Sequence, residues 1–356
     1  RKKVMAPALV LYGLGGLIAG GAALLLERPY PAILAGRIVQ GLGAGGTYQI
    51  ALALTGDLFT SQERTKVVGL LEAANGLGKV VSPILGSLFA LVAWYAPFFA
   101  YGLLAIPIAA AVWWIVEEPR KTRNKKPVRQ YISSLKRIFA DKGVSLLACY
   151  LAGMTGLFLL FGLLSFLSDE LEAAFAIKGF AKGGVLAIPV GAMALTSYLT
   201  GMFLEGKEAL HKPAIIAGLA LACAAFTLLP FASGLAAILA LVSGIGFGIG
   251  LILPPLNTLI TGATESDERG LVTSLYGTVR FFGVAIGPPL FGLVVGAGKL
   301  LLFLGAAGIA AASALAALAF IRPQAMAADP GGSPSGSTAR PHGGGGSRAG
   351  AGEPAG

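Results

Sequence analysis

Four charged side chains stand inside otherwise apolar stretches of this chain: Arg37, Glu72, Lys79 and Arg280. An arginine at the centre of a lipid-embedded helix costs roughly 2.5–3.5 kcal/mol, so such residues normally face the protein interior or a water-filled cavity. The chemistry open to these groups is the binding of a polar solute and the uptake and release of a proton. We therefore treat them as candidate site residues.

Arg37 has an amide close to it in sequence. The stretch from Gly36 to Gly46 reads GRIVQGLGAGG, so Gln40 lies one helical turn after Arg37 on the same face. A dinucleotide loop would need a preceding strand, whereas small residues in a membrane helix let backbones approach each other. We expect Arg37 and Gln40 to face a cavity, with snorkelling of Arg37 to the outer interface as the alternative. The glycines that we assign to helix packing here are Gly41, Gly43, Gly45 and Gly46.

A second group of polar residues lies along one helical face. At 100° per residue, Glu72, Asn75, Lys79 and Pro83 fall within about 60° of one direction, together with Gly76 and Gly86. Burial favours a neutral carboxyl group and a nearby cation favours the charged form, so we expect Glu72 beside Lys79 to exchange a proton near neutral pH. The alternative is that both side chains neutralise polar groups on a neighbouring helix.

Other kinds of site are not expected. Cys149 and Cys223 stand singly in apolar runs, and neither His211 nor His342 has a second ligand type nearby in sequence. Zinc sites, haem sites and disulfide frameworks are therefore improbable. The sequence contains no Walker motif, GxxxxGK[ST], which disfavours ATP as the energy source. We expect no metal, no cofactor and no enzymatic active site.

These residues require helices that cross a membrane. The chain is 55% hydrophobic and 12% charged, and its mean hydropathy is +0.78, whereas soluble domains carry about 25% charged residues. A bilayer core requires about 20 apolar residues per helix. We predict an all-α integral membrane protein with ten spans, at residues 6–26, 31–58, 66–93, 96–116, 143–168, 183–204, 213–232, 235–262, 270–296 and 299–321.

Lysine and arginine are unequally distributed over the connections between these spans. Alternation places 20 of them on one side and four on the other, with three inside spans. Basic residues mark the cytoplasmic side, so we expect both ends of the chain in the cytoplasm. The net charge of +10 then reflects topology and not nucleic-acid binding. We expect a monomer in the inner (plasma) membrane whose partners are the lipid bilayer, protons and a small-molecule substrate.

The sequence repeats itself at an offset of 205 residues, with residues 33–86 aligned on 238–291. Parallel repeats of this kind are a transporter architecture. Residues 143–204 have no counterpart before Arg1, so we expect a parent protein of twelve spans, of which this chain lacks the first two. The coincident residues are Glu63-Arg64 with Glu268-Arg269; Gly41, Gly43 and Gly45 with Gly246, Gly248 and Gly250; and Gly78 and Pro83 with Gly283 and Pro288.

The composition divides the chain into four parts. We predict an N-terminal bundle at 1–119, a cytoplasmic linker at 120–142 with an interfacial helix near 131–139, a C-terminal bundle at 143–322, and a disordered tail at 323–356. Asp169, Glu170 and Glu172 are expected in a solvated outer loop or, alternatively, in a vestibule that attracts cations.

Over nearly all of residues 1–322 these features resemble the major facilitator superfamily. Arg37 to Gly43 (RIVQGLG) is similar to its fourth-span motif RxxQGxG, and the opening RKKVM resembles the end of its cytoplasmic motif between spans two and three. GKVVSPILG at 78–86 resembles the fifth-span motif of the twelve-span drug:proton antiporters, with Ser82 in place of the usual glycine and an atypical Lys79.

The resemblance implies a fold of two helical bundles and transport by alternating access. It implies that Arg37 lines the central cavity and assists proton coupling, and that Asp57 pairs with Arg1 as a cytoplasmic latch. It extends this gating motif to Arg64, Glu268 and Arg269, and it assigns helix packing within the antiporter motif to Gly78, Pro83, Gly86, Gly283 and Pro288.

The predicted function is proton-coupled export of small amphipathic compounds, such as drugs or siderophore-like metabolites. A proton-coupled importer of a sugar or an organic anion has the same fold and is the alternative. Arg280 repeats the position of Asn75 and leaves the interior richer in cations than in acids. An anionic or zwitterionic substrate fits this excess, unless acids in the two absent spans cancel it.

Overall fold

The computed structural model describes residues 2–48, 50–51, 54, 61–116, 128–204, 206–263 and 266–326. Their regular structure is helical, which confirms the predicted all-α class for the described part of the chain. The first group of helices is α1 (Lys2–Leu25), α2 (Tyr30–Gly45), α4 (Ser61–Ala90) and α5 (Ala96–Ile115). The second group is α6 (Val128–Ala173), α7 (Gly179–Phe203), α8 (His211–Leu228), α9 (Leu235–Gly262), α10 (Ser266–Val295), α11 (Lys299–Phe320) and the short α12 (Pro323–Met326), with 3-10 turns at Glu208–Leu210 and Leu229–Phe231.

Eight helices in the described residues are long and apolar enough to cross a membrane: α1, α5, α6 from Ile138, α7, α8 with its flanking 3-10 turns, α9, α10 from Leu271, and α11. α2 has 16 described residues, a length of about 24 Å, and is therefore shorter than the hydrocarbon core of about 30 Å. α4 is long enough at 30 residues, but only part of its side chains is described. The count of ten spans stays a prediction.

The helix predicted at 31–58 is not continuous, because α2 ends at Gly45 and a turn follows at Gly46 and Thr47. The Gly46 amide donates to the Gly43 carbonyl, and the Thr47 amide and hydroxyl both donate to the Ala44 carbonyl. Closely spaced glycines have a low helix propensity, and the threonine hydroxyl gives the last carbonyls an alternative partner. The two effects together end the helix.

The helix boundaries follow the sequence repeat. α4 and α10 each contain 30 residues, and α10 begins and ends 205 positions after α4. α2 and α9 begin at the same offset, at Tyr30 and Leu235. Packing repeats as well, since α1 contacts α2 and α5 just as α8 contacts α9 and α11. The described residues therefore contain four helices of the first group and their four counterparts, plus α6 and α7.

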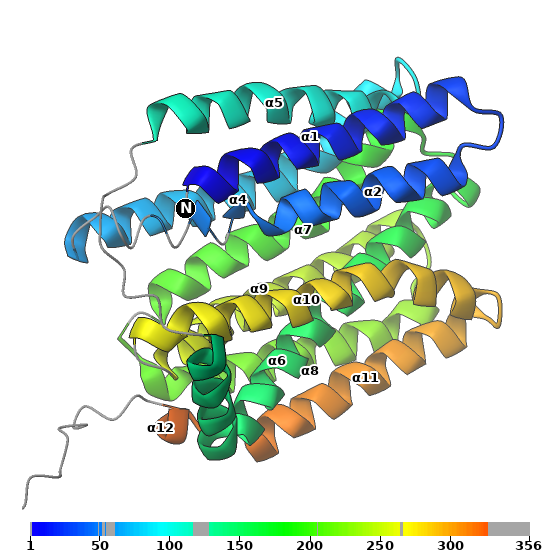
Figure 1. Cartoon of the computed structure of the whole chain (residues 1–356). Coiled ribbons are helices and arrows are strands. Elements are labelled where there is room, and N and C mark those ends of the chain that lie inside the picture. Colours follow the sequence, from blue (N-terminus) through cyan, green and yellow to red (C-terminus); the bar gives the residue numbers. More distant parts are fainter. Residues whose placement is uncertain are drawn as a thin grey trace, which may run out of the picture.

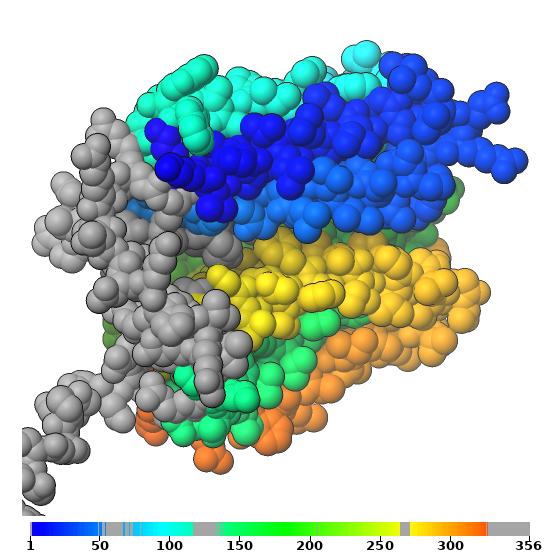
Figure 2. Space-filling view, viewed as in Figure 1, coloured from blue at the N-terminus to red at the C-terminus, as the bar shows by residue number. Residues whose placement is uncertain are grey.

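The two groups lie beside each other with their helices roughly aligned, and α4 packs against α7 between them (Figure 1). Within the second group, α6 packs against α10 and α11, and α7 packs against α9. Figure 2 shows the surface formed by α1 and α2, in blue, and by α10, in yellow. The predicted division of the chain into four parts stays a prediction, since residues 117–127 and 327–356 lie outside the described residues.

Helix α6 differs from the expected loop–span–loop pattern, because it is a single helix of 46 residues. The interfacial helix expected near 131–139 is its first part, and the acids at 169–172 belong to its last turns. Lys142 on α6 donates hydrogen bonds to the carbonyls of Ala263, at 3.0 Å, and Met326, at 3.4 Å. Residues 323–326, expected in the disordered tail, thus form a helix that α6 holds in place.

Candidate functional site

Arg37 and Gln40 meet on α2, as their spacing predicts. Arg37 Nη1 donates to Gln40 Oε1 at 2.5 Å, and the Arg37 guanidinium carbon lies 5.6 Å from the centre of the Phe98 ring on α5. Arg37 is exposed among the described residues, whereas Gln40 is only 4% exposed. The amide nitrogen of Gln40, Nε2, is buried and has no hydrogen-bond partner.

Close backbone contact between α1 and α2 holds this pair in place. A Cβ atom on Gly36 would lie 2.8 Å from the Ala19 amide nitrogen and from the Gly15 carbonyl oxygen of α1. A Cβ on Gly15 would meet the backbone of Gln40 itself. Glycine at both positions lets the helices approach closely enough to bury Gln40.

Arg280 lies near the middle of the membrane-long part of α10, Leu271–Val295. Its side chain is half-buried, and its guanidinium carbon lies 5.3 Å from the centre of the Tyr276 ring and 5.7 Å from that of Phe281. The Nε atom of Arg280 is buried without a hydrogen-bond partner. The described residues contribute no carboxylate that forms an ion pair with Arg280 or Arg37.

Contacts with α6 fix the orientation of this face of α10. The Tyr276 and Tyr150 rings lie 5.6 Å apart, and the Tyr150 hydroxyl donates to the Val272 carbonyl at 2.8 Å. One turn beyond Arg280, a Cβ on Gly283 would lie 3.1 Å from the Phe158 amide nitrogen of α6. α10 thus presents Tyr276 to α6 and carries Arg280 beside that contact.

The polar face predicted on α4 is described only in part. Glu72 and Lys79 lie within the helix, but their side chains are outside the described residues. Asn75 is half-buried. The Pro83 carbonyl faces Gly183 of α7, and a Cβ on Gly86 would lie 4.0 Å from the Tyr101 hydroxyl of α5. The Pro83 end of this face therefore contacts two helices, and the proton-carrier hypothesis for Glu72 stays a prediction.

The predicted gating residues fall largely outside the described part of the chain. Arg1 and Asp57 are not described, and Arg64, Glu268 and Arg269 are described only as backbone in the first turns of α4 and α10. Arg64 and Arg269 are each the fourth residue of their helix. This equivalence follows the repeat, while the latch itself stays a prediction.

The glycines predicted to pack helices occupy two kinds of environment. A Cβ on Gly43 would lie 2.6 Å from the Ala8 carbonyl oxygen of α1, whereas one on Gly41 or Gly78 would meet no described atom within 4 Å. Their counterparts Gly246 and Gly283 lie against α7 and α6. Because α6 and α7 have no counterparts among the described helices of the first group, the equivalent faces of α2 and α4 meet no described atoms at Gly41 and Gly78.

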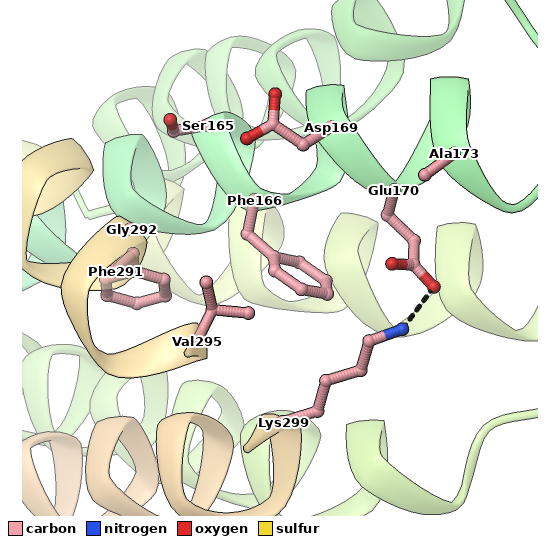
Figure 3. A pocket seen from close by; sticks show the side chains of 9 residues that line it. All are labelled: Ser165, Phe166, Asp169, Glu170, Ala173, Phe291, Gly292, Val295 and Lys299. Atoms are coloured by element: carbon pink, nitrogen blue, oxygen red, sulfur yellow. Dashed lines mark hydrogen bonds and ion pairs between the residues drawn. The ribbon is translucent and has the colours of Figure 1, made fainter. Parts of the chain in front are cut away.

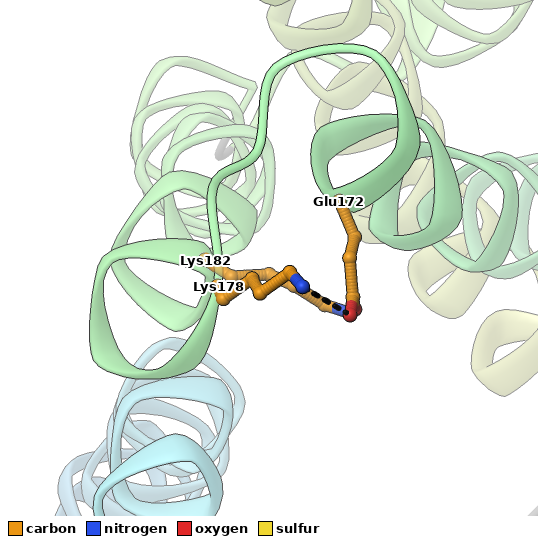
Figure 4. Close-up of polar contacts among 3 residues, drawn as sticks. All are labelled: Glu172, Lys178 and Lys182. Atoms are coloured by element: carbon orange, nitrogen blue, oxygen red, sulfur yellow. Dashed lines mark hydrogen bonds and ion pairs between the residues drawn. The ribbon is translucent and has the colours of Figure 1, made fainter.

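The acids at the end of α6 are mostly paired with lysines. A cavity of about 140 Å³ between α6, α10 and the start of α11 is lined by Phe166, Asp169, Glu170 and Lys299, among others (Figure 3). Lys299 forms an ion pair with Glu170 at 2.6 Å. Glu172 forms ion pairs with Lys182, at 3.1 Å, and with Lys178, at 3.7 Å (Figure 4). Pairing of this kind leaves little negative charge to attract a cation.

Sequence reasoning missed the three aromatic rings that accompany the arginines. Tyr276 lies one turn before Arg280, so helical spacing predicts that contact, whereas it does not predict the contact with the adjacent Phe281. Phe98 is 61 positions from Arg37 in sequence and lies on another helix. No sequence signal points to that contact, because it depends on how α2 and α5 pack around α1.

Repeated sets of apolar helices, eight of them membrane-long in the described residues, with arginines held beside amide and aromatic groups, are typical of a membrane transporter. The Major Facilitator Superfamily model matches residues 1–288 and 185–343, and this chain belongs to that superfamily. The protein is therefore a multi-pass membrane transporter of small molecules and not an enzyme.

Two relatives indicate which members of the superfamily it is similar to. The chain is 36% identical over 306 residues to the bacillibactin exporter of Bacillus subtilis (strain 168), a match that covers 85% of this chain and 76% of that protein. It is 30% identical over 148 residues to the multidrug resistance protein MdtL of Escherichia coli (strain K12 / DH10B), covering 40% of this chain and 37% of that one.

Solved structures share the fold. A bacterial homologue of the human lysosomal transporter Spinster, inward-facing and unoccupied, has a TM-score of 0.65 and 17% identity, covering 92% of this chain and 79% of that one. A fucose:proton symporter of E. coli has a TM-score of 0.60 at 18% identity, covering 89% and 83%. The human organic anion transporter MFSD10 has a TM-score of 0.66 at 20% identity, covering 89% and 77%.

Proposed function

We propose that this protein is a proton-coupled exporter of small amphipathic compounds, such as drugs or siderophore-like metabolites, and that it works by alternating access. The observation that carries the proposal is the 36% identity over 306 residues to a protein named for export of bacillibactin. The weaker match to MdtL, named for multidrug resistance, supports the same direction of transport.

In this proposal the proton and the substrate use groups on different helices. Glu72 on α4 takes up a proton on one side of the membrane and releases it on the other, with Lys79 setting its affinity for the proton. Arg37, held by Gln40, and Arg280 face the substrate pathway. A carboxylate inside a membrane bundle is a recognised element of proton relays.

The remaining features of the proposal concern gating and placement. Arg1 and Asp57 form a cytoplasmic latch together with Arg64, and Glu268 and Arg269 form its repeat. Both ends of the chain lie in the cytoplasm, and the protein acts as a monomer in the inner membrane. The excess of basic residues on one set of connections supports this orientation.

Proton-gradient measurements on the full-length protein test the proposal. Inside-out vesicles with an acid interior receive a panel of lipophilic cations, neutral drugs and siderophore-like anions, while a pH-sensitive dye reports the gradient. We expect some compounds to collapse the gradient in wild-type vesicles. We expect no collapse with Glu72→Gln, because an amide carries no proton, although substrate exchange without a gradient should persist.

Glu27→Gln is the matched control, since Glu27 is exposed in the connection between α1 and α2. It should collapse the gradient as the wild type does. A wild-type protein that responds to no compound, yet takes up a metabolite along a proton gradient in right-side-out vesicles, would be an importer. Normal coupling in Glu72→Gln would remove Glu72 from the mechanism and leave export intact.

A further inference from the structure

Buried hydrogen-bond donors without acceptors mark both arginine groups. Buried polar side-chain atoms normally find a partner, and an unsatisfied one costs about 1–3 kcal/mol. Gln40 Nε2 and Arg280 Nε can only donate, so each lacks an acceptor and not a donor. Six buried side-chain atoms of the described residues have no partner: Gln40 Nε2, His211 Nδ1, Thr273 Oγ1, Tyr276 Oη, Arg280 Nε and Ser313 Oγ.

The ion pairs of the described residues do not supply those acceptors. Each of them involves Glu170 or Glu172, and both acids lie in the last turns of α6 with lysines as partners. Arg280 is instead three residues from the midpoint of Leu271–Val295, about 5 Å along the helix axis from its centre. Its guanidinium therefore lies well inside the apolar stretch of α10, where an unpaired charge is costly.

Beside its two aromatic contacts, Arg280 keeps a buried donor, Nε, without an acceptor. A guanidinium over an aromatic ring interacts through its charge and its flat face, while its N–H groups donate in the plane of the group. Those N–H groups match the two oxygens of a carboxylate or a similar anion. Phe281, whose ring is next to the guanidinium, is 58% exposed. An anionic oxygen and a flat apolar surface can thus be bound side by side.

From this arrangement we infer that Arg280, flanked by Tyr276 and Phe281, binds an anionic oxygen carried on an aromatic ring of the exported compound. The inference rests on the proposed export function and specifies the substrate class for it. The Arg37–Gln40 pair on α2 offers a second set of donors of the same kind beside Phe98. The substrate class is therefore an amphipathic aromatic anion, with the negative charge on oxygen.

Three probes with one aromatic skeleton test this assignment: an aryl carboxylate, its methyl ester and its trimethylammonium analogue. Binding of each probe to the purified full-length protein in detergent is measured by fluorescence, and transport by collapse of the gradient in inside-out vesicles. We expect wild-type protein to bind the carboxylate at least tenfold more tightly than the ester, because charge-assisted hydrogen bonds are the strong ones.

Substitution at Arg280 should remove that preference selectively. Arg280→Gln should weaken carboxylate binding roughly tenfold or more and change ester binding less than twofold, with Arg280→Lys in between because it keeps the charge and loses the planar fork. Phe281→Leu should weaken binding of the aryl carboxylate and leave acetate unaffected. Arg28→Gln, in the exposed connection before α2, is the matched control and should behave as wild type.

The outcomes are distinct from those of the function test. Equal binding of carboxylate and ester by the wild type, or unchanged carboxylate binding in a well-folded Arg280→Gln, overturns the inference. Preferential binding of the trimethylammonium probe overturns it as well. Selective carboxylate binding that depends on Arg280, in a protein that does not collapse the gradient, upholds the inference and rejects proton-coupled export.

Discussion

At the scale of single residues, the polar groups of this transporter are held by short-range geometry within one helix. Arg37 and Gln40 are three positions apart and form a hydrogen bond, and Arg280 contacts the rings at positions −4 and +1. Helical periodicity brings together the neighbours three and four positions apart, whereas Phe281 is next to Arg280 in the chain. The burial of Gln40 has a different origin, because it depends on the glycines of α1 and α2.

Gln40→Leu separates the functional role of this amide from a structural one. Leucine has a similar size and removes a buried donor that has no partner, so the thermal stability of the folded protein should stay the same or rise. Transport should fall about tenfold, because Arg37 loses the acceptor that orients it. Melting temperature and probe transport are the two measurements.

The control for this change is Gln324→Leu, since Gln324 is exposed on α12. It should leave transport unchanged. A stable Gln40→Leu protein with wild-type transport would show that Gln40 has no part in orienting Arg37, and a loss of stability without a loss of transport would assign the amide to packing.

At the scale of helices, glycine decides how closely two backbones approach. α8 and α9 meet where a Cβ on Gly248 would lie 2.6 Å from the Gly218 carbonyl oxygen. The repeat-related pair α1 and α2 meets in the same way at Gly43. Lipid provides no hydrophobic driving force between helices, so van der Waals contact at close approach drives their association instead. Glycine therefore lets two helices approach closely in both halves of the repeat.

Gly248→Ala tests this packing role. The added methyl group would contact a backbone carbonyl that cannot move aside, so we expect a destabilisation of about 1–3 kcal/mol, as for other overpacked sites. Gly244→Ala lies one turn earlier on α9, where a Cβ meets no described atom within 4 Å. It should be neutral or slightly stabilising, because alanine favours the helix.

Thermal unfolding of the two purified variants in the same detergent provides the comparison. If both variants melt at the wild-type temperature, the contact at Gly248 does not determine how closely α8 and α9 approach. Equal destabilisation of both would assign the effect to the loss of glycine flexibility and not to the contact with α8.

At the scale of the whole molecule, α4 and α7 join the two groups of helices. A Cβ on Gly183 in the first turns of α7 would lie 2.7 Å from the Pro83 carbonyl oxygen and from Ser87 Cβ near the end of α4. This contact lies at one end of the bundle. Alternating access by rocking of two repeats requires contacts at one end to open as those at the other end close.

Cross-linking Ser87→Cys to Gly183→Cys, with Cys149 and Cys223 replaced by alanine, tests that motion. A disulfide requires the two Cβ atoms to be about 3.5–4.5 Å apart, so a displacement of about 1 Å suffices. Oxidation should stop transport, and reduction should restore it, because the bond prevents this end from opening. The measurement is transport by the same vesicles before and after reductant.

Each single-cysteine variant serves as a control and should be insensitive to oxidation. Full transport by a quantitatively cross-linked double variant would mean that α4 and α7 stay together throughout the cycle. The rocking motion would then have to occur at other contacts between the two groups.

The sequence alone determined the membrane-spanning character, the repeat and the placing of Arg37 and Gln40 on one helical face, because hydropathy, offset and helical spacing are properties of the linear chain. It also placed the boundaries of α4 and α10 to within a few residues. It placed a continuous helix over 31–58 incorrectly, because the turn at Gly46 depends on local competition for carbonyls.

Only the tertiary structure decided which surfaces these residues meet. Whether Gly43 packs while Gly41 faces open space, and whether Phe98 lies under Arg37, depends on which helices surround α2. The same holds for the pairing of Glu172 with Lys182 and of Glu170 with Lys299. Contacts between distant segments arise from helix packing, and in lipid that packing is set by complementary shape, which a hydrophobic pattern does not encode.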